Sequence, residues 1–239
     1  MNEIKILIIT SCSGEKKINV DNPAIAKEID NIELRIKKEE ELKEYKLTAK
    51  EMFISNQNII LNLAISNIKN IDICYLSSAY GLINQDELVI PYDINFSAMS
   101  LNDIDNRSKF LKINEESYYK CKNYDLIFFL LNIEYIRFLN LPINLPESKK
   151  QIFIISSKDE KFLSNIENIY YLAFSIDEIY KFNMHLNDFR AKIIKIICKE
   201  YKNDNKVFLK IYNNPLYIRD IISNYLYKDK FEQLNFFDT

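Results

Sequence analysis

Four short runs of β-branched and aliphatic residues, each bounded by polar residues, alternate along the chain with segments of helical periodicity. Runs of this length and composition are typical of buried strands. They span residues 4–10, 71–78, 124–131 and 151–157. Helical patterns lie between them, over residues 47–67 and 100–123. Strands that alternate with helices predict an α/β fold, in which a mostly parallel central sheet is flanked by helices.

The pattern changes after about residue 160, where helical periodicity becomes dominant. We therefore expect an α/β core domain over residues 1–160 and a helical C-terminal region over residues 161–230. Within the core, the dense mixed charge near residues 28–46 predicts a solvated helical insertion on the surface. Residues 231–239 continue no helical pattern and are expected to form a flexible tail.

The balance of charged residues bears on whether the protein binds nucleic acid. With 32 basic and 34 acidic residues, the net charge is −2. A strongly basic domain would favour non-specific binding to nucleic acid, and this balance does not, although it leaves room for a local basic groove. No run approaches the ~18 apolar residues that a membrane span needs, and the N-terminus has the pattern of a strand rather than a signal peptide. We expect a cytoplasmic protein without a membrane partner.

Glycine is scarce, since Gly14 and Gly81 are the only two in 239 residues, where about 17 would be usual. Glycine is hardest to replace where the backbone needs a positive φ or approaches another group closely. Each glycine follows an apolar run, so both are expected in special turns just past the carboxyl ends of strands. In open α/β sheets, ligands bind at this edge.

The first of these loops offers hydroxyls, a thiol and a lysine. With backbone N–H groups, such a loop can hold a phosphate or another anion, although an ordinary turn would have the same composition. The motifs GxxxxGK[ST] and GxGxxG are absent, the four cysteines form no CxxC pair, and there is one histidine. We therefore predict no cofactor and no metal site. The candidate ligand-binding residues of this loop are Ser11, Cys12, Ser13, Gly14 and Lys16.

The second loop follows the run 71–78 and carries two tyrosines and three acids. A tyrosine can stack on a nucleobase, and a neighbouring carboxylate can act as acid, base or orienting group. In the alternative interpretation, the tyrosines pack in the core and the acids are solvated. The candidate catalytic residues are Asp93, Tyr80 and Asp86, and the candidate ligand-binding residues are Ser78, Gly81 and Tyr92.

Three ordered segments resemble the YaaA-like family of bacterial proteins. SCSGEKK, at 11–17, resembles the opening Cys-x-x-x-Lys loop of that family. LTAKEMFISNQN, at 47–58, resembles its Ala-Arg-x-Leu-Tyr helix start, with Lys50 and Phe53 in place of the arginine and the tyrosine. CYLSSAYGLINQDELVIPYDINFSAMS, at 74–100, resembles its Leu-Ser-Ala, Gly-Leu and Pro-Tyr-Asp string.

The resemblance covers residues 4–138. It implies an α/β core similar to those of YaaA-like and uracil-DNA-glycosylase-like proteins, a link to DNA or nucleobases, and Lys50 as a further ligand contact. The first hypothesis is an enzyme that acts on a nucleobase or N-glycosidic bond, in DNA or a nucleotide, for DNA repair, modification or defence. A base in a duplex would have to be flipped out to reach such a site. The second hypothesis is a non-catalytic DNA-binding stress-response protein.

Three further residues have two interpretations each. His185 titrates near neutrality, as catalytic histidines do, but its isolated position favours a structural role. Cys12 could be a nucleophile, yet no histidine partner is identifiable nearby, so a pocket-lining role is favoured. Arg190 is a candidate for an anion contact, with a solvated position on a helix surface as the alternative.

The C-terminal sequence resembles the short peptide, Gln-Leu-x-Leu-Phe, with which bacterial proteins dock onto the replication sliding clamp. A terminal segment could place a glutamine and apolar anchors into preformed pockets of the clamp. Alternatively, the phenylalanines fold back onto the core. The sliding clamp therefore joins DNA or a nucleotide among the predicted partners. The residues concerned are Gln233, Leu234, Phe236 and Phe237.

Overall fold

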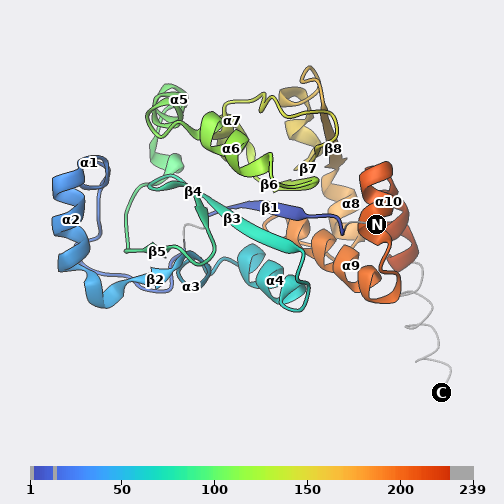
Figure 1. Cartoon of the computed structure of the whole chain (residues 1–239), viewed down its shortest axis with the longest axis horizontal. Coiled ribbons are helices and arrows are strands. Elements are labelled where there is room, and N and C mark those ends of the chain that lie inside the picture. The colour runs from blue at the N-terminus through green and yellow to red at the C-terminus, as the bar shows by residue number, and fades with distance from the viewer. Residues whose placement is uncertain (1–2, 13–14, 227–239) are drawn as a thin grey trace.

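The computed structural model describes residues 3–12 and 15–226. In this part of the chain, one six-stranded sheet has the order β4-β3-β1-β6-β7-β8 (Figure 1). Its strands are β1 (Ile6–Ser11), β3 (Ile71–Ser77), β4 (Gly81–Asn84), β6 (Leu126–Leu130), β7 (Lys150–Ser156) and β8 (Ile169–Phe174). All neighbours pair in parallel except β4, which is antiparallel to β3. The expected mostly parallel α/β sheet is confirmed.

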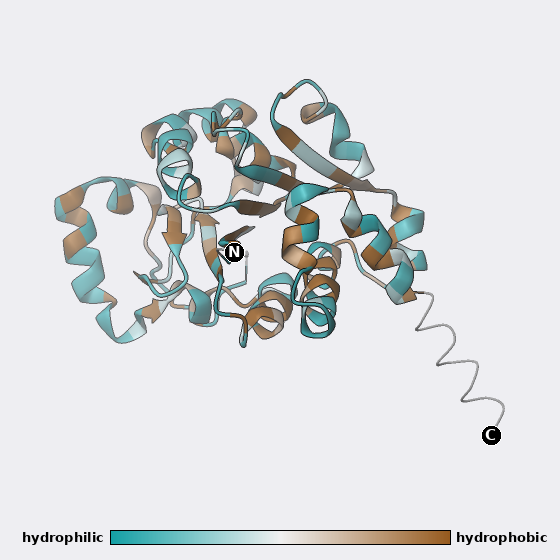
Figure 2. Cartoon of the chain, turned by 45° about the vertical axis from the view of Figure 1, so that its right-hand side comes forward, coloured by the Kyte–Doolittle hydropathy of each residue, from teal (hydrophilic) through white to brown (hydrophobic). Residues whose placement is uncertain are grey.

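The central strand β1 shows why its sequence is apolar without interruption. Ile6 and Ile8 belong to one hydrophobic core, and Leu7 and Ile9 belong to the other. Successive side chains point to opposite faces of a strand, so both faces of the sheet are covered. In Figure 2, the central strands are largely brown, whereas the helices alternate between hydrophilic and hydrophobic colours.

Helices cover the two faces of the sheet. The labelled helices are α1 (Ala26–Asp30), α2 (Ile32–Glu41), α3 (Ala49–Met52), α4 (Asn56–Ile65), α5 (Leu101–Phe110), α6 (Ile113–Cys121), α7 (Ile133–Leu139), α8 (Ile176–Lys181), α9 (Phe189–Asn203) and α10 (Val207–Asn213). Residues 217–226 are helical as well. Leu61 of α4 and Ile193 of α9 pack in the first core, while Ile104 of α5 and Ile136 of α7 pack in the second. Figure 1 shows α4 and α9 on one side of the sheet and α5, α6 and α7 on the other.

The strand order creates a crevice beside β1. The chain passes from β1 to β3 on one side, then returns to β6 on the other side of β1 and continues to β7 and β8. Connections that leave a central strand in opposite directions part at its carboxyl end, which is where doubly wound sheets bind ligands. The site is therefore expected between the ends of β1 and β6.

A small arm projects beside the sheet. It consists of α1 and α2, which Figure 1 shows at the left, and it occupies the stretch for which we expected a charged insertion. After the arm, the chain forms the short strand β2 (Leu47–Thr48), which pairs with β5 (Leu88–Val89) in a separate two-stranded sheet. None of the helices among the described residues is both long and apolar enough to cross a membrane.

The C-terminal half differs from the expectation at one strand. Residues 161–230 were expected to be helical, but β8 lies within them and completes the sheet. This strand is at the edge, so buried Leu172 and Phe174 alternate with more exposed residues such as Tyr170. Alternation gives a weaker signal than the continuous apolar runs of the central strands.

Gly81 has the conformation that its rarity predicted. Its φ is +76°, and it pairs with Ser77 where the chain turns from β3 into β4. A Cβ atom at this position would lie 3.2 Å from Cδ1 of Ile113. Both the backbone conformation and the close neighbour therefore favour glycine.

Candidate functional site

A cavity of about 700 Å³ opens at the carboxyl ends of β1, β6 and β7. Its volume is in the range of small-molecule sites in proteins, and its place is the crevice that the strand order creates. Residues at the ends of the three strands and just after them form its wall, together with the first turns of α4, α7 and α9. The wall includes Ser11, Cys12, Ser55, Gln57, Leu130, Glu134, Tyr135, Ser156, Lys158, Asp159, Phe189 and Arg190.

A buried hydrogen-bond network holds the floor of the cavity. Gln57 donates to Oγ1 of Thr10 at 2.9 Å and to the carbonyl of Leu130 at 3.0 Å. Thr10 donates to Asn58 at 3.0 Å, and Asn58 donates to the carbonyl of Ser11 at 3.2 Å. These bonds join α4 to the ends of β1 and β6. A satisfied polar network of this kind fixes the relative positions of the elements that it links.

Arg190 brings a cation with free donors to the wall. The residue is 7% exposed, and its guanidinium lies 4.6 Å from the centroid of the Phe189 ring. Its Nε donates to the carbonyl of Ile154 at 2.9 Å, while Nη1 and Nη2 have no acceptor among the described residues. Burial lowers the pKa of Arg190 to about 10, and nearby Asp159 opposes this shift. The group is charged at neutral pH and has unused donors.

Asp159 is an acid of the cavity that, like Arg190, is almost completely buried. It is 4% exposed and lies in the 3-10 helix η3 (Ser157–Phe162), and its side chain makes no hydrogen bond or ion pair with the described residues. Burial raises its pKa, and Glu134 acts in the same direction. Lys158 and Arg190 oppose the shift. A carboxyl group with a raised pKa at a cavity is suited to transfer protons.

The first turn of α7 places two more side chains at the cavity. Asn132 caps this helix by accepting from the N–H of Tyr135 at 3.2 Å, and Glu134 and Tyr135 both line the wall. The Tyr135 hydroxyl donates to the carbonyl of Cys12 at 2.9 Å. A hydroxyl has a single proton to donate, so its oxygen accepts from the Cys12 thiol, whose sulfur lies 3.0 Å away.

This hydrogen bond bears on the chemistry of Cys12. A cysteine nucleophile is usually activated by a neighbouring base or cation, whereas the hydrogen-bond partner of the Cys12 sulfur is the Tyr135 hydroxyl. Cys12 therefore lines the cavity as a hydrogen-bonded thiol. All four cysteines of the chain are buried.

The expected first-loop lysine contacts the second loop. Nζ of Lys16 lies 4.2 Å from the centroid of the Tyr92 ring. Burial lowers the pKa of Lys16, while Cys12 and Asp93 raise it. The Tyr92 hydroxyl lies 2.9 Å from Oγ of Ser77. The structure thus brings Cys12, Lys16, Tyr92 and the exposed Asp93 into one neighbourhood, next to the cavity at Cys12.

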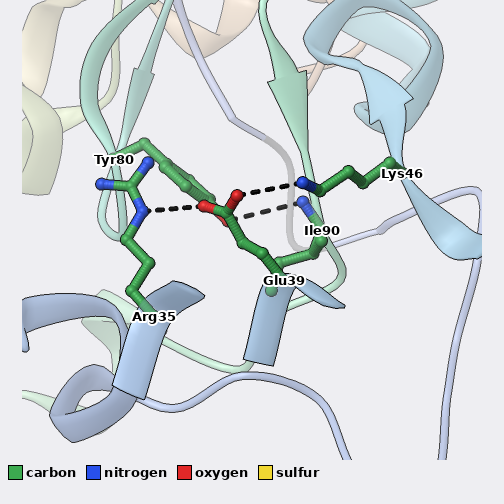
Figure 3. Close-up of polar contacts among 5 residues, drawn as sticks. All are labelled: Arg35, Glu39, Lys46, Tyr80 and Ile90. Carbon is green, nitrogen blue, oxygen red and sulfur yellow. Dashed lines mark hydrogen bonds and ion pairs between the residues drawn. The ribbon is translucent and has the colours of Figure 1, made fainter. Parts of the chain in front are cut away.

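Tyr80 lies under the arm rather than in the wall of the cavity. Figure 3 shows its hydroxyl accepting from the N–H of Ile90, at 3.4 Å. The Arg35 guanidinium lies 5.0 Å from the centroid of its ring, and Glu39 bridges Arg35 and Lys46 at 2.9 and 3.0 Å. Burial raises the pKa of Tyr80 to about 12. In this setting the phenol joins α2 to the core.

Strand β4 separates the remaining second-loop candidates. Because β4 runs back along β3, the exposed Asp86 lies near Asp72 and Tyr124, at the opposite end of the parallel strands from the cavity. Exposed Lys50 donates its backbone N–H to Gln85, next to Asp86. The prediction from the sequence assumed a single loop over residues 77–93, without strand β4. For this reason it placed Asp86 in the same site as Tyr92 and Asp93.

The structure places two other candidate residues, Ser78 and His185, in different surroundings. Ser78 is buried, and its hydroxyl donates to the carbonyl of Ile94 at 2.6 Å. His185 is exposed next to the cavity residue Leu186. The described residues contain no group of three or more His, Cys, Asp or Glu side chains that could hold a metal ion.

Some predictions fall outside the described residues. In the first loop these are Ser13 and Gly14, and in the C-terminal tail they are Gln233, Leu234, Phe236 and Phe237. The anion loop and the clamp-binding peptide stay predictions for these positions.

Comparisons with protein-family models, with curated proteins and with solved structures found no match to this chain. The resemblance to the YaaA-like family stays a prediction based on its three segments.

Sequence reasoning did not single out Gln57, Glu134, Tyr135 or Asp159. The signal for Asp159 was present, because the polar string Ser156 to Glu160 follows a buried strand as the two glycine loops do. The rule that ligands bind at the carboxyl ends of parallel strands applies equally to β6 and β7. Because the prediction started from the two glycines, it applied this rule only to the loops after β1 and β3.

Proposed function

We propose that the cavity is the active site of an enzyme that cleaves the N-glycosidic bond of a nucleotide. The observation that carries this proposal is Asp159, a buried carboxyl group without a partner among the described residues, in a cavity that also contains Glu134 and Arg190. The choice of a nucleobase compound comes from the resemblance to the YaaA-like family and to uracil-DNA-glycosylase-like cores.

The chemistry needs two carboxyl groups in different protonation states. When the C1′–N bond breaks, the base departs with the electron pair and takes up a proton, while positive charge develops on the sugar. Asp159, whose pKa burial raises, donates the proton to the base. Glu134, as the carboxylate, accepts a proton from the water that forms the new C1′–O bond. This division of labour is the one that paired carboxyl groups perform in glycoside hydrolysis.

The dimensions favour a single nucleotide. About 700 Å³ is within the range of small-molecule pockets, and a base within duplex DNA would have to leave the helix to enter. The net charge of −2 gives no general attraction to a polyanion. A free nucleotide is therefore the substrate class to test first.

The experiment follows the release of free base from a panel of nucleosides, nucleotides and single-stranded DNA by chromatography. Asp159→Asn keeps the shape of the side chain and removes the acid, so turnover should fall by about 10²- to 10⁴-fold. Asp177→Asn, at an exposed position in the first turn of α8, is the matched control and should retain turnover.

Two results would contradict the proposal. One is undiminished base release by Asp159→Asn, and a loss in Asp86→Asn instead would restore the assignment made from the sequence. The other is an absence of turnover on every substrate together with DNA affinity that falls steeply with salt, which would favour the non-catalytic DNA-binding protein.

A further inference from the structure

The first turn of α9 has unused hydrogen-bond donors. Its N-cap residue, Asp188, does not cap the helix with its side chain, which instead accepts from the N–H of His185 at 3.1 Å and pairs with Lys192 at 3.3 Å. The backbone N–H groups of Arg190 and Ala191 have no acceptor among the described residues. The N-terminus of a helix carries a partial positive charge, and free N–H groups there are suited to bind an anion.

The Arg190 side chain is an independent sign of a ligand at the same place. It is more than nine-tenths buried, and only its Nε has a partner among the described residues. Buried arginines normally have their donors satisfied by protein or water. The free end of the guanidinium is a planar fork that matches the oxygens of a carboxylate or a phosphate.

Two more donors lie on the same wall. Ser156 is buried and lines the cavity, and its hydroxyl has no partner among the described residues. Lys158, two residues further on, also lines the cavity. The acids of the cavity are Glu15, Glu134 and Asp159. Asp159 lies near Arg190, and burial favours its neutral form, so it leaves the cations of this wall available to an anion.

We infer that the Arg190 end of the cavity binds a phosphate monoester, so that the substrate is a nucleoside monophosphate rather than a nucleoside. The available donors on residues that line the cavity are the two Nη groups and the backbone N–H of Arg190, the Ser156 hydroxyl and the Lys158 ammonium. They outnumber the sites that a carboxylate offers but suit the three terminal oxygens of a phosphate. The nucleoside part of this inference rests on the proposed function, whereas the phosphate part does not.

The test measures binding of inorganic phosphate by isothermal titration calorimetry at constant ionic strength, with acetate as the carboxylate probe. Wild-type protein should bind phosphate, and Arg190→Gln should bind it at least tenfold more weakly. Arg190→Lys keeps a positive charge without the fork and should also weaken binding. Arg219→Gln, which changes an exposed arginine paired with Glu178, is the matched control and should bind phosphate like the wild type.

A measurement on the wild type alone makes the test independent of how the variants fold. In ¹⁵N–¹H spectra, added phosphate should shift the backbone amides of Arg190 and Ala191 more than those of α10, which does not line the cavity. Equal phosphate affinity in wild type and Arg190→Gln, unshifted amides, or acetate that binds as tightly as phosphate would each overturn the inference.

The two proposals can fail separately. Phosphate binding without any release of base would leave the subsite in place and remove the glycosidic reaction. Release of base from nucleosides at least as fast as from their monophosphates would support the reaction and overturn the phosphate subsite.

Discussion

Arg107 and Arg190 are buried to almost the same degree, 8% and 7% exposed, but they differ in their partners. Arg107 donates from Nε to the carbonyl of Ser78 at 2.8 Å and from Nη2 to that of Ala79 at 3.1 Å, and Nη1 pairs with Asp30 at 2.5 Å. Arg190 has one partner among the described residues. Burial by itself therefore does not distinguish a structural arginine from a ligand-binding one.

The same contrast extends to the neighbours of each arginine. Around Arg107, the hydroxyls of Ser77, Ser78 and Tyr92 all make hydrogen bonds within the protein. Around Arg190, the side chains of Ser156 and Asp159 have none among the described residues. A region whose polar groups are satisfied holds elements together, and a region whose buried polar groups are free is prepared for something else to bind.

The largest difference between the two regions is expected in the free energy of unfolding when each arginine is replaced by methionine. Arg107→Met leaves Asp30 and two carbonyls without their partner, so the free energy of unfolding should fall by about 3 kcal/mol. Arg190→Met removes a buried cation with a single partner, and its stability should change by no more than about 1 kcal/mol. Urea unfolding followed by circular dichroism measures both. Equal losses would mean that Arg190 has structural partners too.

Two buried serines provide a smaller version of the same comparison. Ser78→Ala leaves the carbonyl of Ile94 without its donor and should lower the free energy of unfolding by about 1.5 kcal/mol. Ser156→Ala removes a hydroxyl that has no partner among the described residues, so its stability should be unchanged within error. A loss in Ser156→Ala as large as that in Ser78→Ala, in the same urea titrations, would contradict the contrast.

The smallest expected effect depends on pH. Burial raises the pKa of Asp159 in the folded protein above its unfolded value of about 3.9. The folded state therefore binds this proton more tightly, and stability falls as pH rises from the unfolded pKa to the folded one. At neutral pH, Asp159→Asn should be more stable than the wild type by about 1 kcal/mol, as expected for loss of a buried group without a partner.

That advantage should shrink as the pH falls through the folded pKa and should be gone below the unfolded one. Thermal unfolding of both proteins at a series of pH values from about 3 to about 8, roughly the range in which carboxyl groups titrate in proteins, provides the measurement. A difference that stays constant over the series would show that Asp159 is not held in an unfavourable ionised form.

The central strands and the turn at Gly81 could be predicted because each depends on a short piece of sequence. A continuous apolar run specifies a strand covered on both faces, as β1 illustrates, and a rare glycine specifies a positive φ. Strand β4 could not be predicted in this way. Its four residues acquire their strand conformation from pairing with β3, which no local pattern encodes.

The site is harder to predict for a related reason. Gln57, Glu134, Asp159 and Arg190 are separated by more than twenty residues at each step, and they meet because successive crossovers return the chain to the same edge of the sheet. Their residue types are common, and none lies in a motif. What distinguishes Asp159 and Arg190 is the lack of partners in the folded chain, which is a property of the packing.

The burial of all four cysteines has a practical consequence for following this protein in solution. Burial raises the pKa of Cys74 and Cys198 to about 12 and that of Cys121 as well, and the Cys12 sulfur is hydrogen-bonded to the Tyr135 hydroxyl. Maleimide dyes react with accessible thiolates, so the native chain offers them a low background. A single cysteine introduced at exposed Ile36 of α2 would take up a fluorophore selectively and report the position of the arm without removal of any natural thiol.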